Sequence, residues 1–381
     1  MDSGTVRGKP PNLDLDLLRR VSPNRVEAVT SSTSTAYAVS PDSGRYWTAE
    51  GAWQVAEGIH RIPLPLPMDG LKAINVYVIE AEHGLTLIDG GWAIAESRTL
   101  LEKCLAQIGF KVTDITHFLV THVHRDHYTQ AAVLGKEVGA HVSLGIGDQP
   151  SLDLMVCAEF IEENPTLGVL RSSGAIDLAE QWAAMHEGAH PDLDLWRYPD
   201  TWLDGDHQVE VGTRTIDAVH TPGHTQGHFV FAELATGILF AGDHVLPTIT
   251  PSIGFEPVPV DQPLGDFMAS LTKVRGLPDL RLLPAHGPVA RSSHARVDQL
   301  LAFHEERLQL CVDALVAGPA TAYDVAGTLP WTRHAHAFST LDIFNSALAS
   351  METKAHLELL VARGQATRWV TDAGVVFTLT D

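Results

Sequence analysis

Histidine and aspartate side chains gather in one short segment of this sequence. The segment T-H-V-H-R-D-H directly follows residues 117–120, an apolar run that predicts a buried strand. Alternate side chains of a strand point to the same side, so His122 and His124 should face one way. Asp126 and His127 can reach a second position as the chain turns into a helix. Imidazole and carboxylate are common metal ligands, so we favour a metal site over the alternative of surface histidines beside a solvated aspartate.

Three later segments could complete such a site. Each places a His or Asp immediately after an apolar run and beside a glycine, where the backbone can bend toward a shared centre. The segments are H-T-P-G-H, which ends at His224, A-G-D, which ends at Asp243, and P-A-H-G-P, which contains His286. Each residue alone is more often an ordinary loop residue than a ligand. Together with the first segment they provide enough ligands for two metal ions.

The composition supports metal binding and argues against polyanionic partners. The 381 residues include 20 histidines, and 47 acidic against 26 basic residues give a net charge of −21. Nucleic acids and anionic membranes both favour clustered Lys and Arg. The three cysteines, Cys104, Cys157 and Cys311, lie far apart and predict neither a disulfide framework nor a thiolate metal site. No signal-like or membrane-spanning segment is evident, so we expect a cytoplasmic protein without a membrane partner.

Strand and helix patterns alternate along the central part of the chain. Residues 1–50 are polar and predict an extended or partly disordered leader. Residues 51–292 carry short β-like runs mixed with helices in two successive blocks, which fits an α/β sandwich. A helical stretch at about 146–202 interrupts them as an insertion that could cap the site. Its apolar residues either line a substrate pocket or form ordinary helix core: Met155, Phe160, Leu167, Leu170, Trp182, Met185 and Trp196.

Residues 293–381 predict a separate C-terminal domain of winged-helix order. Helical patterns are followed by two β-like runs, 365–370 and 375–380, around a turn. Residues 301–381 hold five basic and nine acidic residues, a net charge of −4, which opposes insertion into a nucleic-acid groove. We therefore expect this domain to pack on the main domain, shape the pocket or mediate a homodimer.

The motifs H-x-H-x-D-H, H-T-P-G-H-T, G-D and A-H-G-P together resemble the metallo-β-lactamase-fold hydrolase superfamily, and within it the glyoxalase II and thioesterase-like branch. The resemblance covers about residues 59–288. It implies a four-layer αββα sandwich and a site for two divalent metal ions, most simply Zn²⁺, with Fe or Mn as alternatives. The C-terminal helices and hairpin also resemble a winged-helix appendage of some members, including a ribonuclease-like group. The implied ligands are His122, His124 and His224 for one ion, Asp126, His127 and His286 for the other, and Asp243 between both.

The resemblance also implies residues that support the ligands. Asp89 matches an aspartate that fixes the ligand loop. His228, like His220 and His244, would at most orient ligands, the alternative being a solvent-facing role. Tyr128 stands where the family usually has glycine, and its phenol could donate to an oxyanion or simply pack.

Two divalent ions held in this way predict hydrolytic chemistry. A hydroxide bridging the ions would attack the substrate, and Asp126 could take its proton and pass it to the leaving group. We expect a hydrolase for an ester, thioester or lactone of a small, partly apolar substrate. The alternatives are an RNA phosphodiesterase that uses the winged helix, which the negative C-terminal charge disfavours, a β-lactam hydrolase, or a non-catalytic scaffold.

Overall fold

The computed structural model describes residues 46–67, 70–156, 164–186, 192–331 and 336–380. All of them belong to one compact unit. Most of the expected leader therefore lies outside the described residues, as do Cys157 and Phe160. No helix in these ranges combines the length and the apolar character that a membrane span requires.

The N-terminal half forms a seven-stranded sheet in sequence order, β1 to β7. Strands β1 to β4 pair antiparallel, whereas β4 to β7 pair parallel through helical crossovers. The strands are β1 (Trp53–Ala56), β2 (Ile59–Pro65), β3 (Ala73–Ala81), β4 (Gly84–Ile88), β5 (Ile115–Leu119), β6 (His141–Gly145) and β7 (Thr201–Leu203).

The second block forms a five-stranded sheet of order β12-β11-β10-β9-β8. Neighbours are antiparallel except β11 and β12, which run parallel because helix α6 connects them. The strands are β8 (His207–Val211), β9 (Arg214–His220), β10 (Phe229–Glu233), β11 (Ile238–Gly242) and β12 (Arg281–Pro284).

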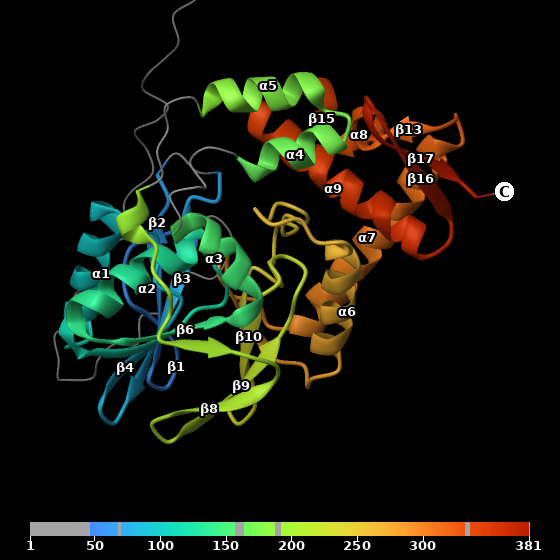
Figure 1. Ribbon diagram of the computed structural model, residues 1–381. Helices are drawn as coiled ribbons and strands as arrows, with labels where there is room; N and C mark the ends of the chain where they lie inside the picture. Colours follow the sequence, from blue (N-terminus) through green and yellow to red (C-terminus); the bar gives the residue numbers. More distant parts are fainter. Residues whose placement is uncertain (1–45, 68–69, 157–163, 187–191, 332–335, 381) are drawn as a thin grey trace, which may run out of the picture. The chain divides into compact units, whose positions relative to one another are not determined.

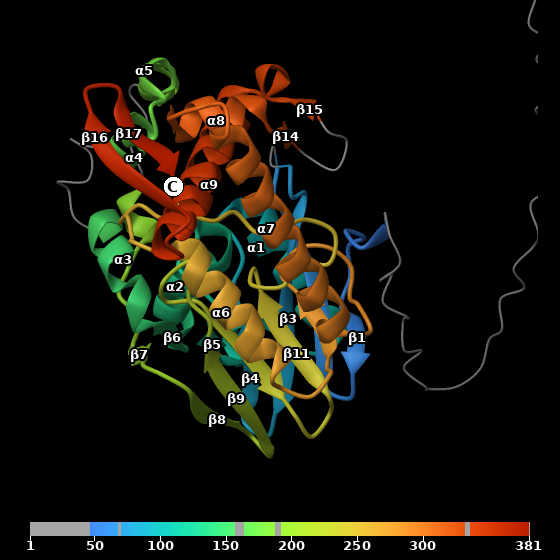
Figure 2. The ribbon, with the colours of Figure 1, turned by 90° about the vertical axis from the view of Figure 1, so that its right-hand side faces the viewer.

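The two sheets pack face to face between two helical layers (Figure 1). Their facing sides share one buried cluster, in which the rings of Tyr77 and Phe240 lie 5.3 Å apart. Helices α1 (Ala95–Gln107) and α2 (Arg125–Val138) cover the outer face of the first sheet. Helices α6 (Pro263–Arg275) and α7 (Ser293–Leu315) cover the second, as Figure 2 shows from another side. The predicted αββα sandwich is confirmed.

The C-terminal region continues the core of the second sheet. Its main elements are α8 (Ala322–Thr328), α9 (Ile343–Ala362) and the hairpin β16 (Ala366–Thr371) and β17 (Gly374–Leu379), with short strands β13 (Ala320–Thr321), β14 (Pro330–Trp331) and β15 (His336–Ala337). One apolar cluster runs from β9–β11 through α6 and α7 to α9 and β17. The expected helices and hairpin are therefore present, while the winged-helix interpretation and a domain boundary at 293 stay predictions.

The helical insertion packs partly on the first sheet, through α3, and partly on the C-terminal region. It contains α3 (Gln149–Val156), α4 (Pro165–Ser172) and α5 (Ile176–Met185). Leu170 and Trp182 are buried with Ala347 and Met351 of α9. The apolar residues of the insertion were expected either to line a substrate pocket or to form ordinary helix core. Leu170 and Trp182 belong to helix core. Trp196 likewise packs on the first sheet's outer core, and Met185 is 48% exposed.

Candidate metal centre

The first candidate ligands follow β5 in a turn that Asp89 holds in place. Asp89 has a left-handed backbone, with φ 62°, which costs a non-glycine residue about 1–3 kcal/mol. Its Oδ1 accepts hydrogen bonds from the backbone N–H of Thr121 at 2.8 Å and from its hydroxyl at 2.9 Å. Its Oδ2 accepts from His127 Nδ1 at 3.0 Å. One buried carboxylate therefore ties the end of β5 to the first turn of α2.

One group of side chains comes together from two loops and the end of β11. His122 Nε2 lies 2.9 Å from His124 Nδ1, which lies 3.1 Å from His224 Nε2. His224 Nε2 is in turn 3.5 Å from Asp243 Oδ2. Three nitrogens and one carboxylate oxygen thus face one another closely enough to hold a metal ion.

A second group lies on the other side of Asp243. His286 Nε2 is 3.3 Å from Asp126 Oδ2, and His127 Nε2 is 3.7 Å from the same oxygen. Asp243 Oδ1 lies 3.6 Å from His127 Nε2 and 3.3 Å from His286 Nε2. The two oxygens of Asp243 therefore face different groups, which is the arrangement expected of a ligand shared by two ions.

Hydrogen bonds from the outer ring nitrogens fix three of the histidines. His127 Nδ1 donates to Asp89, His224 Nδ1 donates to the carbonyl of Ser252 at 2.7 Å, and His286 Nδ1 donates to the carbonyl of Ala73 at 2.8 Å. A proton on Nδ1 leaves the Nε2 lone pair free to point at the centre. Such partners orient metal-binding imidazoles in proteins.

Unpaired buried atoms indicate that these residues fit cations. His127 Nε2, Asp243 Oδ1 and His286 Nε2 are buried and have no hydrogen-bond partner among the described residues. A buried polar atom without a partner costs about 1–3 kcal/mol. A cation between these three atoms would engage all of them at once.

The protonation of the cluster fits the same conclusion. Burial, with a further contribution from His224, lowers the pKa of His124 to about 3, so its ring is in the neutral form that binds metals. Burial also acts to lower the pKa of His127, but the carboxylates of Asp89 and Asp126 outweigh it and raise that pKa well above its usual range. Without an ion, these carboxylates stabilise the protonated form of His127. A divalent ion would supply that positive charge instead of the proton.

Asp148 joins the two ligand loops and was missed by the sequence analysis. Its Oδ2 accepts the backbone N–H of Val123 at 2.8 Å, and its Oδ1 accepts the N–H of Gly227 at 2.7 Å. The loops can approach because Gly145 and Gly227 have no side chains: a Cβ on Gly145 would clash with the carbonyl oxygen of Gly227. No motif marks this contact; the sequence shows only an acid just after a glycine-containing strand end.

The predicted supporting residues behave differently from one another. His228 is fully buried, and its Nε2 accepts the backbone N–H of Asp243 at 3.2 Å while its ring stacks on His122. The hydroxyl of Tyr128 donates to the carbonyl of Arg197, and its ring stacks on Trp196. Tyr128 therefore packs rather than pointing an oxyanion donor at the cluster.

His220 and His244 also differ in their surroundings. His220 Nε2 bonds to the carbonyl of Gln226 at 2.8 Å, on the loop that follows His224. His244 is buried against the ring of Phe267. Neither histidine belongs to the two groups around Asp243.

A cavity of about 150 Å³ lies between α9 and the loop before α6. Glu256 lines it and also accepts the backbone N–H of Gln226 at 2.9 Å, on the loop that carries His224. Lys354 and Arg368 also line it. Glu256 thus connects the wall of the cavity to the loop that carries His224, but no candidate ligand lines the cavity.

Comparison with known proteins decides the family. The sequence model of the metallo-beta-lactamase superfamily matches residues 69–152 and 165–286, more than half of the chain. This chain belongs to the metallo-beta-lactamase superfamily. The resemblance found in the motifs is thereby confirmed, and the chain is a superfamily hydrolase with candidate metal-binding residues.

Relatives within the superfamily carry several descriptions. The lactamase-like protein adaB of Aspergillus niger is 27% identical over 276 residues, which are 72% of this chain and 68% of that protein. The atrochrysone carboxyl ACP thioesterase of Aspergillus fumigatus is 26% identical over 70% of this chain but only 50% of its own length. A metallo-beta-lactamase family protein from Thermus thermophilus, known from its crystal structure, has a TM-score of 0.70 at 26% identity and covers 86% of this chain and 100% of its own.

Proposed function

We propose that this protein hydrolyses a thioester or ester of a small, partly apolar acyl group at a centre of two divalent ions. The observation that carries the proposal is the position of Asp243, whose two oxygens face two separate groups of histidine and aspartate side chains. Nitrogen and oxygen ligands without thiolate favour Zn²⁺. Two such ions, when bound, would lower the pKa of a water and polarise the scissile carbonyl.

The chain's own residues divide the work between holding and proton transfer. His122, His124 and His224 would hold one ion, and His127 and His286 the other with Asp126. The side chain of Asp126 is 14% exposed, compared with 9% for Asp243, so Asp126 is the ligand carboxylate with more access to the reacting groups. We assign to Asp126 the proton of the attacking water, which it would pass to the leaving sulfur or oxygen.

One relative and the net charge of the chain favour a thioester as the substrate. A relative described as an acyl-carrier-protein thioesterase aligns with 70% of this chain, which favours a thioester. The net charge of −21 disfavours a phosphodiester in RNA, because nucleic-acid binding requires clustered positive charge. A thioester therefore comes before an oxygen ester or a lactone in the order of expected substrates.

The test combines a substrate panel with one variant and a matched control. The metal-loaded protein is assayed on acyl-CoA, acyl carrier protein thioesters, aryl esters, lactones, a β-lactam and single-stranded RNA. Asp126→Ala should abolish turnover of the best substrate and leave the circular dichroism spectrum unchanged. Asp177→Ala is the control, because Asp177 also lies in the first turn of a helix but is exposed and far from the ligand groups in sequence.

Three results would contradict the proposal. Hydrolysis of the β-lactam or the RNA in preference to every thioester and ester would show another substrate class. No turnover of any panel member by metal-loaded protein would oppose a hydrolase of this type. Full activity in Asp126→Ala would remove the assigned proton transfer.

A further inference from the structure

A third group of metal-ligating side chains lies between α7 and α9 and shares no residue with the centre around Asp243. His304 belongs to α7, and Glu352 and His356 belong to α9. One candidate ligand atom from each lies within 4.8 Å of the other two. We propose that these three residues form a separate, structural binding site for one Zn²⁺ ion that joins the two helices.

The spacing of the residues suits one ion. Glu352 and His356 are four positions apart, so they lie on the same face of α9, one turn from each other. His304 Nδ1 lies 3.2 Å from His356 Nε2. Two nitrogens that bind the same tetrahedral Zn²⁺ at 2.0–2.1 Å lie about 3.3 Å apart. The two rings would therefore need little movement to bind one ion.

The ring of His356 is already oriented for this role. Its Nδ1 donates to the carbonyl of Glu352 at 2.7 Å, so the Nε2 lone pair faces His304. A backbone carbonyl that fixes the outer nitrogen is the same device that holds His224 and His286 in the main centre. Burial lowers the pKa of His356 to about 4, which keeps the imidazole in its neutral, metal-binding form.

The carboxylate of Glu352 is the candidate ligand that the hydrogen bond between the rings leaves unused. His304 is fully buried, and an ion on its Nδ1 would place the ring proton on Nε2, which has no hydrogen-bond partner among the described residues. Within the same residues, the carboxylate of Glu352 forms no hydrogen bond or ion pair. An ion would engage this carboxylate together with one nitrogen of each ring. Because Glu352 is only half-buried, a water could fill the fourth position.

Arg307 is the cation whose charge acts on all three residues of the group, and it has other partners. It lies one turn after His304, and its Nη1 donates to the carbonyl of Pro330 at 2.8 Å. Its guanidinium also lies 4.3 Å from the centre of the Trp331 ring. The positive charge of Arg307 should weaken the proposed site relative to the main centre, which has two carboxylates, so the site should lose its ion at a lower chelator concentration.

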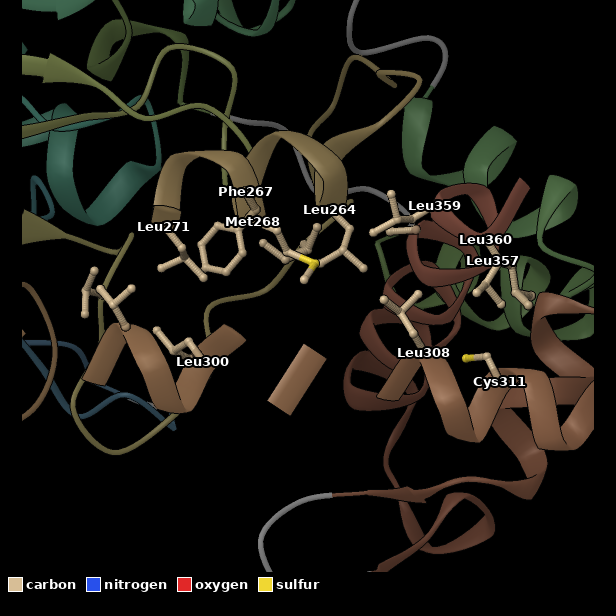
Figure 3. Packing of buried hydrophobic residues seen from close by; sticks show 14 of the residues in the cluster. Leu264, Phe267, Met268, Leu271, Leu300, Leu308, Cys311, Leu357, Leu359 and Leu360 are labelled. Atoms are coloured by element: carbon tan, nitrogen blue, oxygen red, sulfur yellow. The ribbon is translucent and has the colours of Figure 1, made fainter. Parts of the chain in front are cut away.

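The proposed ion would connect helices that already share an apolar contact. Figure 3 shows Leu308 and Cys311 of α7 near Leu357 and Leu360 of α9, all within the cluster beneath the second sheet. An ion held by His304, Glu352 and His356 would add a further link between α7 and α9 and stabilise the C-terminal helices against unfolding.

The test measures bound metal in the full-length protein. Wild type, Glu352→Gln and His356→Gln are equilibrated with Zn²⁺, desalted and analysed by elemental mass spectrometry. Wild type should retain one equivalent more than either variant, and zinc should raise its melting temperature more than theirs. Glu306→Gln and His83→Gln are the controls, because both residues are exposed, and both should retain the wild-type amount.

Equal zinc content in wild type and folded Glu352→Gln would overturn the proposal. If His356→Gln fails to fold, the zinc content of Glu352→Gln still tests the proposal. The half-buried carboxylate of Glu352 makes no described contact on which folding depends. The same comparison is made in a variant that carries both Asp243→Ala and His286→Ala and so lacks ligands of the main centre. Adding Glu352→Gln to this variant should still reduce its bound zinc by one equivalent. No difference in that background would also overturn the proposal, whatever the fate of the hydrolase activity.

Discussion

Replacing Asp148 by alanine tests the contact that joins the two ligand loops. The change leaves the backbone N–H groups of Val123 and Gly227 without their acceptor in a buried position. Each unpaired N–H costs about 1–3 kcal/mol, so the loss is about 2–6 kcal/mol. Burial raises the pKa of Asp148 to about 6 from 3.8, so keeping it ionised at pH 7.5 costs about 3 kcal/mol, which alanine recovers. Taking the middle of the first range, we therefore expect a net loss of about 1 kcal/mol of unfolding free energy.

The same change should weaken metal binding, because both loops carry ligands. A lost supporting contact typically reduces metal affinity by about 10–100-fold. The assay is denaturant unfolding followed by circular dichroism at pH 7.5, with and without chelator, together with competitive zinc titration. Asp153→Ala is the control: it removes an exposed contact with the Tyr198 hydroxyl and should cost about 0.5 kcal/mol or less. Wild-type stability and zinc affinity in Asp148→Ala would refute the reasoning.

Three further changes have distinct expected outcomes. Asp89→Ala frees the ring of His127 and should lower zinc affinity by about 10–100-fold in a competition titration, whereas unchanged affinity would show that Asp89 has no such role. Burial raises the pKa of Glu256 to about 8 from 4.5, so the wild type should lose stability as the pH rises from about 4.5 to about 8, by at most about 5 kcal/mol in total. Glu256→Gln should remove that loss. Denaturant unfolding at pH 6 and pH 9 should therefore show a smaller fall in unfolding free energy for the variant than for the wild type, and an equal fall in both would contradict the prediction. Tyr128→Phe should leave kcat unchanged and cost about 1 kcal/mol, because the hydroxyl only donates to Arg197, and a large fall in kcat would instead indicate a role in the reaction.

The candidate ligands could be predicted because their signals are local. His122 to His127 stand in one motif at the end of an apolar strand, and His224, Asp243 and His286 each follow another apolar strand. Strand ends on one edge of a packed sandwich meet in space, so their convergence required only the correct fold class.

Apart from the contacts of Asp89, which the resemblance implied, the supporting contacts could not be predicted, because backbone atoms make them. The carbonyls of Ser252 and Ala73, which orient His224 and His286, leave no mark in the residue types. The role of Asp148 depends on the close approach of two glycine-containing loops far apart in the sequence.

The sequence also could not predict the shortest strands or which elements cover the apolar faces of the helices. Strand β7 has only three residues and is partly exposed, so no periodicity marks it. The pattern around Leu170 and Trp182 predicted buried helix faces, but it could not show that α9, more than 150 residues later, would cover them.

The most direct test of the central claim is the position of bound metal. Crystals grown with Zn²⁺ would be measured at the zinc absorption edge, where anomalous scattering locates the ions. We expect two peaks about 3.5–4 Å apart, one on each side of the Asp243 carboxylate. A single peak beside Asp243, or none, would contradict a centre of two ions.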